Sequence, residues 1–129
     1  MINILIILFL LIGQAENEAK EHFNRGFNRY KNNDFPGAIH EYSKAISVDP
    51  FYIRAHYYRG VAHYDIKKYE DAIYDFSTVI SLEGGNANAW FYRGLSRYRS
   101  GDKINGCDDI RRANSLGLHV VDYISRMCN

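Results

Sequence analysis

The stretch Ala55–Ile80, AHYYRGVAHYDIKKYEDAIYDFSTVI, decides the fold of this chain. In its first half the apolar residues follow the spacing i, i+3, i+7 and i+11, which lays one apolar face along a helix: Ala55, Tyr58, Ala62 and Ile66. After a polar break at Lys67-Lys68 a second helical pattern follows: Ala72, Phe76, Val79 and Ile80. The stretch therefore predicts two helices joined by a tight turn.

The same pattern returns along the chain with a period of 34. The pair Arg59-Gly60 occurs one period earlier as Arg25-Gly26 and one period later as Arg93-Gly94. Such self-similarity is typical of a solenoid, in which stacked units bury together the apolar faces that no unit buries alone. The sequence therefore predicts helical hairpins over about residues 19–52, 53–86 and 87–118, and a capping helix over about residues 118–128.

These repeats resemble the tetratricopeptide repeat family, and in particular its small exported bacterial members. The family's small, aromatic and Pro positions are met in the first copy by Gly26, Ala38, Tyr42, Ala45 and Pro50. The second copy meets them with Gly60, Ala72, Phe76 and Val79. The third copy departs from the pattern at Gly106, Ile110 and Leu118.

The resemblance covers about residues 19–118 and implies an all-α fold, a right-handed superhelical solenoid of three helix-turn-helix hairpins with a C-terminal capping helix. It also implies a non-enzymatic module that binds a protein or peptide in its concave groove. Self-association into a structural scaffold, through the apolar surface beside the Glu16 end, is the alternative function.

Residues 1–12, MINILIILFLLI, and the following Gly13-Gln14-Ala15 resemble a secretory signal peptide, although no Lys or Arg precedes the apolar run. The run is shorter than the about 17 to 25 residues that cross a bilayer. We expect cleavage after Ala15 and export of residues 16–129 as one domain, periplasmic or secreted, without a stable membrane span. The alternatives are a buried helix of the domain and an uncleaved anchor formed by residues 1–12.

Composition and motifs argue against several other functions. The formal net charge of +1 gives no basic footprint for nucleic acid. The sequence has no HExxH, no CxxC and no Gly-rich phosphate loop, so we expect no enzymatic activity, no metal and no cofactor. His22 and His56 fall in phase with Trp90, which predicts a shared packing position for the three side chains.

Two sets of residues are expected to fix the hairpins. In each copy an acid follows the repeated Arg by sixteen residues, which predicts the ion pairs Arg25–Glu41, Arg59–Asp75 and Arg93–Asp109. If the chain turns near Gly117, Cys107 and Cys128 come together, which allows a disulfide that holds the capping helix. Two buried free thiols are the other interpretation.

The first helix of each hairpin is expected to line the concave surface, with aromatic and cationic side chains that suit a peptide. We call the ten predicted partner-binding residues the inner stripe: Lys20, Phe23, Phe27, Arg54, Tyr57, Tyr58, Asn88, Phe91, Tyr92 and Arg99. Some family members clamp a C-terminal carboxylate with Lys and Asn. Those places here hold Phe23, Phe27, Tyr58, Asn88 and Tyr92, so the sequence does not support that clamp.

Overall fold

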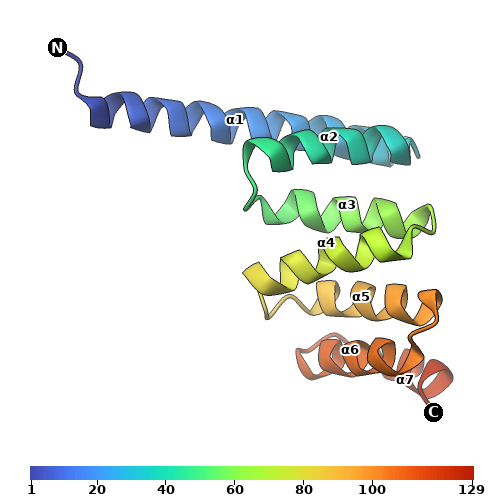
Figure 1. Ribbon diagram of the computed structural model, residues 1–129. Coiled ribbons are helices and arrows are strands. Elements are labelled where there is room, and N and C mark those ends of the chain that lie inside the picture. The colour runs from blue at the N-terminus through green and yellow to red at the C-terminus, as the bar shows by residue number, and fades with distance from the viewer.

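The computed structural model describes residues 1–129 as seven α-helices without a strand (Figure 1). Six of them form three antiparallel hairpins stacked in chain order, and the seventh lies at the C-terminal end of the stack. Their bounds are α1 Ile4–Lys31, α2 Phe35–Val48, α3 Ile53–Asp65, α4 Tyr69–Leu82, α5 Ala87–Ser100, α6 Lys103–Ser115 and α7 Val121–Met127. The predicted all-α repeat solenoid is confirmed.

The turn inside each hairpin is built in the same way three times. The residue that ends it has a positive φ at equivalent positions of the three repeats: Asn33 (60°), Lys67 (63°) and Gly101 (108°). The backbone N–H of the next residue then donates to the carbonyl five residues before it: Asp34 to Arg29, Lys68 to His63 and Asp102 to Arg97. This left-handed turn satisfies carbonyls that the end of the first helix leaves unpaired and reverses the chain.

The core lies between the helices as three clusters, one for each hairpin. Phe23 and Tyr42 fill the first, Phe76 and Val79 the second, and Leu95 and Ile110 the third. A small residue lets the helices approach closely in each hairpin. At Gly94 an added Cβ would lie 2.7 Å from the backbone oxygen of Gly106, so α5 and α6 meet backbone to backbone.

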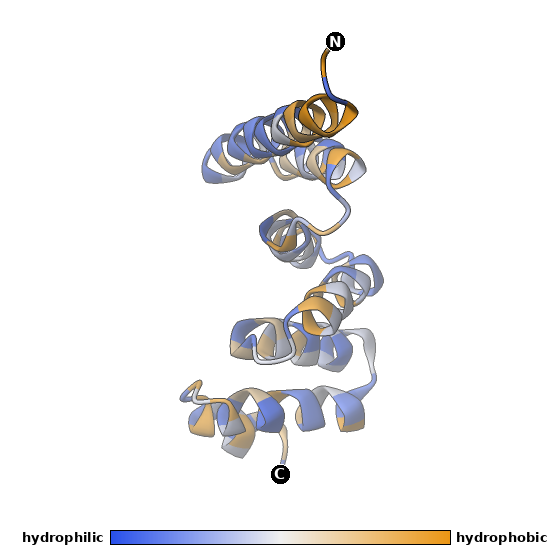
Figure 2. Cartoon of the chain, turned by 90° about the vertical axis from the view of Figure 1, so that its left-hand side faces the viewer, coloured by the Kyte–Doolittle hydropathy of each residue, from blue (hydrophilic) through white to orange (hydrophobic).

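Helix α1 runs without a break from the apolar segment into the first hairpin and projects beyond the stack (Figure 1). Its first part is apolar around its circumference, as the orange end of the helix in Figure 2 shows. The first buried residue is Ala19, so residues 1–15 add nothing to the core. No helix of the structure combines the length and the apolar character needed to span a membrane.

Helix α7 closes the C-terminal end of the third hairpin. Val120, just before it, is buried against Leu95 and Ile110, and Ile124 and Met127 pack on the same cluster. In the structure Cys107 of α6 and Cys128 are joined by a disulfide, with Cα atoms 5.5 Å apart. Closing a loop of this length stabilises a fold by about 3 kcal/mol in the chain-entropy description.

Candidate functional site

The second hairpin contains the predicted pair Arg59–Asp75, as a buried network. The Arg59 guanidinium donates to both carboxylate oxygens of Asp75, with Nη2 to Oδ1 at 2.7 Å, and Asp75 is only 1% exposed. Arg59 Nη1 also donates to the Ser43 hydroxyl of the preceding hairpin at 3.1 Å. The Arg therefore joins helices α3 and α4 to each other and to α2.

The third hairpin repeats this network one period later. Arg93 Nε donates to Asp109 Oδ2 at 2.8 Å, and Arg93 Nη1 donates to Ser77 at 3.3 Å. Arg97, one turn further along α5, adds a second cation at 2.9 Å from the same carboxylate oxygen. Both Arg–acid pairs are structural, and both are buried rather than exposed as surface ion pairs are.

In the first hairpin the predicted pair Arg25–Glu41 is wrong. Arg25 bonds to Glu21 on the exposed side of α1, at 2.7 Å. The Glu41 carboxylate instead accepts from His22 Nδ1 at 2.9 Å, and this bond holds the pKa of Glu41 below its usual value. No hairpin precedes α1, and the residue at the position of Ser43, sixteen before Arg25, is Phe9 of the projecting segment.

The predicted shared position holds for His56 and Trp90, whose rings both act as caps, whereas His22 bonds to Glu41 instead. His56 Nε2 donates to the carbonyl of Pro50, and Trp90 Nε1 donates to the carbonyl of Gly84, each at 2.8 Å. Each ring so fixes the loop that enters its own hairpin. No three His, Cys, Asp or Glu side chains are placed to hold a metal ion.

The structure places the ten stripe residues on the first helix of each hairpin, that is, on α1, α3 and α5. Four of them are exposed: Lys20, Arg54, Asn88 and Arg99. Five aromatic residues are half-buried and so remain partly exposed: Phe27, Tyr57, Tyr58, Phe91 and Tyr92. The stripe therefore offers partly exposed aromatic side chains between polar and cationic positions.

Phe23 does not belong to this surface. It is 1% exposed and packs on Tyr42, at 5.6 Å between ring centroids. The Arg54 guanidinium covers its other face, 4.5 Å from the ring centroid. The sequence predicted Phe23 for the stripe because it shares the phase of Tyr57 and Phe91, but a neighbouring cation shields it from solvent.

Aromatic contacts across adjacent hairpins hold the remaining rings in place. Tyr58 meets Phe27 edge-on at 5.3 Å, and Tyr57 meets Tyr92 edge-on at 6.2 Å. Burial raises the pKa of Tyr57 and Tyr92, so both phenols stay protonated and can donate hydrogen bonds. Tyr58 and Tyr92 therefore have a structural role and remain partly exposed as well.

Two contacts to this surface are not evident from the repeat pattern. The Tyr30 hydroxyl donates to Asp65 Oδ2 at 2.8 Å and so links α1 to α3 beside the stripe. Tyr123 of α7 packs edge-on against Phe91 at 5.1 Å. The sequence signal for the first contact is that Tyr30 and Asp65 are 35 residues apart, one more than the period. The signal for the second is that Tyr123 is an aromatic residue in the predicted capping helix.

The inner stripe is an open surface. The structure has two cavities, of about 310 and 280 Å³, and residues of α6, α7 and the chain end line them. Neither includes a residue of the stripe. The stripe therefore suits an extended or helical segment lying across several helices better than a small molecule enclosed in a pocket.

Comparison with known families gives the same architecture. A family model described as TPR repeat matches residues 28–67, and one described as Tetratricopeptide repeat matches residues 53–86. Residues 28–86 are thus tetratricopeptide repeats. No curated protein sequence matches the chain.

Solved tetratricopeptide structures share its fold. The second TPR domain of Spaghetti (RPAP3), bound to the HSP90 peptide SRMEEVD, is 27% identical, with a TM-score of 0.76 over 80% of this chain and 95% of that one. The second TPR domain of human RPAP3, with the HSP70 peptide SGPTIEEVD, is 24% identical, with a TM-score of 0.80 over 91% and 98%. MamA of Desulfovibrio magneticus RS-1 is 20% identical, with a TM-score of 0.80 over 87% of this chain and 63% of that one.

Proposed function

We propose that this tetratricopeptide protein is a non-enzymatic interaction module that binds a peptide segment of a protein partner along the inner stripe. The observation that carries the proposal is the set of half-buried, partly exposed aromatic residues on α1, α3 and α5. Rigid aromatic side chains give a large contact area at a low entropic cost, because their neighbours already hold them.

The mode of recognition differs from a carboxylate clamp. Lys20 and Arg99 are exposed, and neither forms an ion pair within the chain, so both cations are free to meet a partner. Between them lie Tyr58 and Tyr92, at places where a clamp needs polar or cationic side chains. We therefore expect the partner to contribute apolar or aromatic side chains to the middle of the stripe.

The test is a peptide selection followed by matched variants. Peptides selected from a random displayed library are measured against the parent, against Lys20→Glu with Arg99→Glu, and against the control Lys44→Glu with Lys68→Glu. The two doubles change the charge equally, and the control lies outside the stripe. We expect at least about a ten-fold loss of affinity for the stripe variant only. Equal losses in both variants would contradict the proposal.

We also propose that the module is exported after cleavage at Ala15. The apolar segment lies outside the core, because every residue from 1 to 15 is exposed or half-buried. Cleavage would leave Glu16 and Glu18 in the first turn of α1, where acids favour a helix N-terminus. Intact mass of the exported protein should correspond to a chain beginning at Glu16, whereas a retained Met1 would contradict the proposal.

A further inference from the structure

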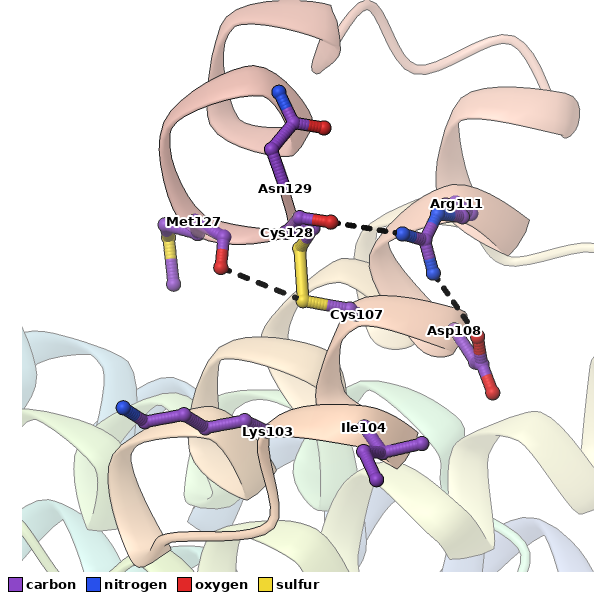
Figure 3. A pocket seen from close by; sticks show the side chains of 8 residues that line it. All are labelled: Lys103, Ile104, Cys107, Asp108, Arg111, Met127, Cys128 and Asn129. Carbon is purple, nitrogen blue, oxygen red and sulfur yellow. Dashed lines mark hydrogen bonds and ion pairs between the residues drawn. A yellow bond between two sulfur atoms is a disulfide. The ribbon is translucent and has the colours of Figure 1, made fainter.

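The larger cavity lies beside the disulfide, away from the inner stripe. Its lining includes both cysteines, the cationic Lys103 and Arg111, and the apolar Ile104 and Met127 (Figure 3). Cys128 is half-buried, whereas Cys107 is 6% exposed. Cys128 is thus the less buried of the two cysteines that line the cavity.

Little besides this bond holds α7 in position. The helix has seven residues and no side-chain N-cap bond, and a helix this short is not stable by itself. Its chain end receives one side-chain donor from α6, from Arg111 Nη2 to the Cys128 carbonyl at 3.0 Å. The other attachments are a long bond from the Val120 N–H to Asn114 Oδ1 at 3.4 Å, the edge-on packing of Tyr123 on Phe91, and apolar contacts of Val120, Ile124 and Met127 with the third core cluster.

We propose that Cys107–Cys128 is a site of thiol–disulfide exchange with a dithiol reductant and acts as a lock on α7. Tyr123 of α7 covers one side of Phe91, so the position of α7 affects the inner stripe. That effect on partner binding rests on the proposed function. Opening the lock releases α7 and frees the Phe91 ring for a partner. The inner stripe then has two states: one with Phe91 covered by α7 and one with Phe91 free.

The exchange has two steps. A thiolate of the reductant attacks Sγ of Cys128, a mixed disulfide forms, and Cys107 leaves as a thiolate that takes a proton from water. The second thiol of the reductant then attacks the reductant sulfur of the mixed disulfide and releases the Cys128 thiolate. Two electrons pass from the dithiol to the cysteine pair. Lys103, one turn before Cys107 on α6, lines the same cavity, and its ammonium lies over the Tyr98 ring, 5.5 Å from the ring centroid. We infer that this positive charge favours the departing thiolate through the field in the cavity, without a direct contact.

The test uses the purified oxidised protein without denaturant. After treatment with dithiothreitol and alkylation, intact mass should show two modified cysteines. Hydrogen exchange of residues 121–128 should then be at least about ten-fold faster, with α2 to α5 unchanged. The double variant Cys107→Ser with Cys128→Ser should show the same fast exchange, which separates the lost bond from any effect of the reductant. A bond that is reduced only in urea, or unchanged exchange in α7 after reduction, would overturn the proposal.

A second measurement tests the role of the cavity. Lys103→Gln should slow reduction by about two- to five-fold, whereas the exposed Lys44→Gln should not change it. Equal rates would overturn the assignment of Lys103. Hydrogen exchange of residues 121–128 reports the release of α7 without a partner, whereas affinity for a selected peptide reports binding at the inner stripe. If the lock opens but stripe variants bind peptides normally, the proposed function fails and the exchange site stands.

Discussion

The first and second hairpins have a cation, an acid and a His at the same repeat positions, but their contacts differ. In the second, Arg59 is part of a buried network that reaches Ser43 of the neighbouring hairpin, and His56 holds the incoming loop. In the first, Arg25 lies on the surface and His22 takes its place at the acid. A repeat position therefore acquires its role from the hairpin stacked before it.

The largest difference is expected at the buried acids. Asp75→Asn should lower the free energy of unfolding by about 3 kcal/mol, because it leaves the Arg59 guanidinium without its charge partner in a buried place. Glu41→Gln should cost about 1 kcal/mol, since an amide oxygen still accepts from His22. Urea unfolding of both variants gives the comparison, and equal losses would contradict it.

The close approach of the two helices at the repeated Gly should make the third hairpin more sensitive than the second to a Gly→Ala substitution. Gly94→Ala places a methyl group 2.7 Å from a backbone oxygen, so a helix must shift, and we expect a loss of about 2 kcal/mol. At Gly60 the nearest atoms are those of the Phe76 ring at 3.0 Å and the Cβ of Asp75 at 3.1 Å, so an added methyl group is less crowded than at Gly94, and the better helix propensity of Ala offsets part of the cost. Gly60→Ala should change stability by less than about 1 kcal/mol in thermal unfolding. A larger loss at Gly60 would reverse this ranking.

The three hairpin turns allow a smaller test. Lys67 has a φ of 63° at the position where the third hairpin has Gly101 and the first has Asn33. Lys67→Gly should raise the free energy of unfolding by about 0.5 to 1 kcal/mol, because it removes the steric strain of a left-handed residue with a Cβ. Chemical denaturation measures the gain. A loss of stability would show that the Lys side chain contributes more than its backbone strain costs.

The smallest expected effect is the pH dependence that arises from His63 in the second hairpin. Burial lowers the pKa of His63, although Asp75 and Asp71 oppose the shift. In the unfolded chain a His has a pKa of about 6.5. Below that pH the unfolded chain therefore binds more protons than the folded one, and the free energy of unfolding decreases as the pH falls. His63→Asn should reduce this fall between pH 7.5 and 5.5, whereas the exposed His40→Asn should leave it unchanged. Urea midpoints at both pH values test this.

Much of the fold follows from the period of 34. It predicts the hairpins, the shared position of His56 and Trp90, and the pairs at Asp75 and Asp109, because those residues have the same neighbours in consecutive repeats. It fails for Arg25, because the array begins there. The signal was available: the Ser sixteen residues before Arg59 and Arg93 has no counterpart before Arg25.

The candidate surface was predicted less completely. Periodicity assigns a side chain to one face of a helix, but it does not show which neighbour covers that face. Arg54 lies across Phe23 and removes it from the surface, and Tyr123 approaches Phe91 from a helix outside the three repeats. Both contacts join different repeats through long side chains, so the pattern within one repeat does not contain them.

The most direct test of the interaction surface is a hydrogen-exchange footprint of a selected peptide bound to the protein. We expect protection in α1, α3 and α5, which contain the inner stripe, and little change in α2, α4 and α6. Lys20→Glu with Arg99→Glu should weaken this protection. Protection confined to α2, α4 and α6, or to the cavity between α6 and α7, would contradict a binding surface on the stripe.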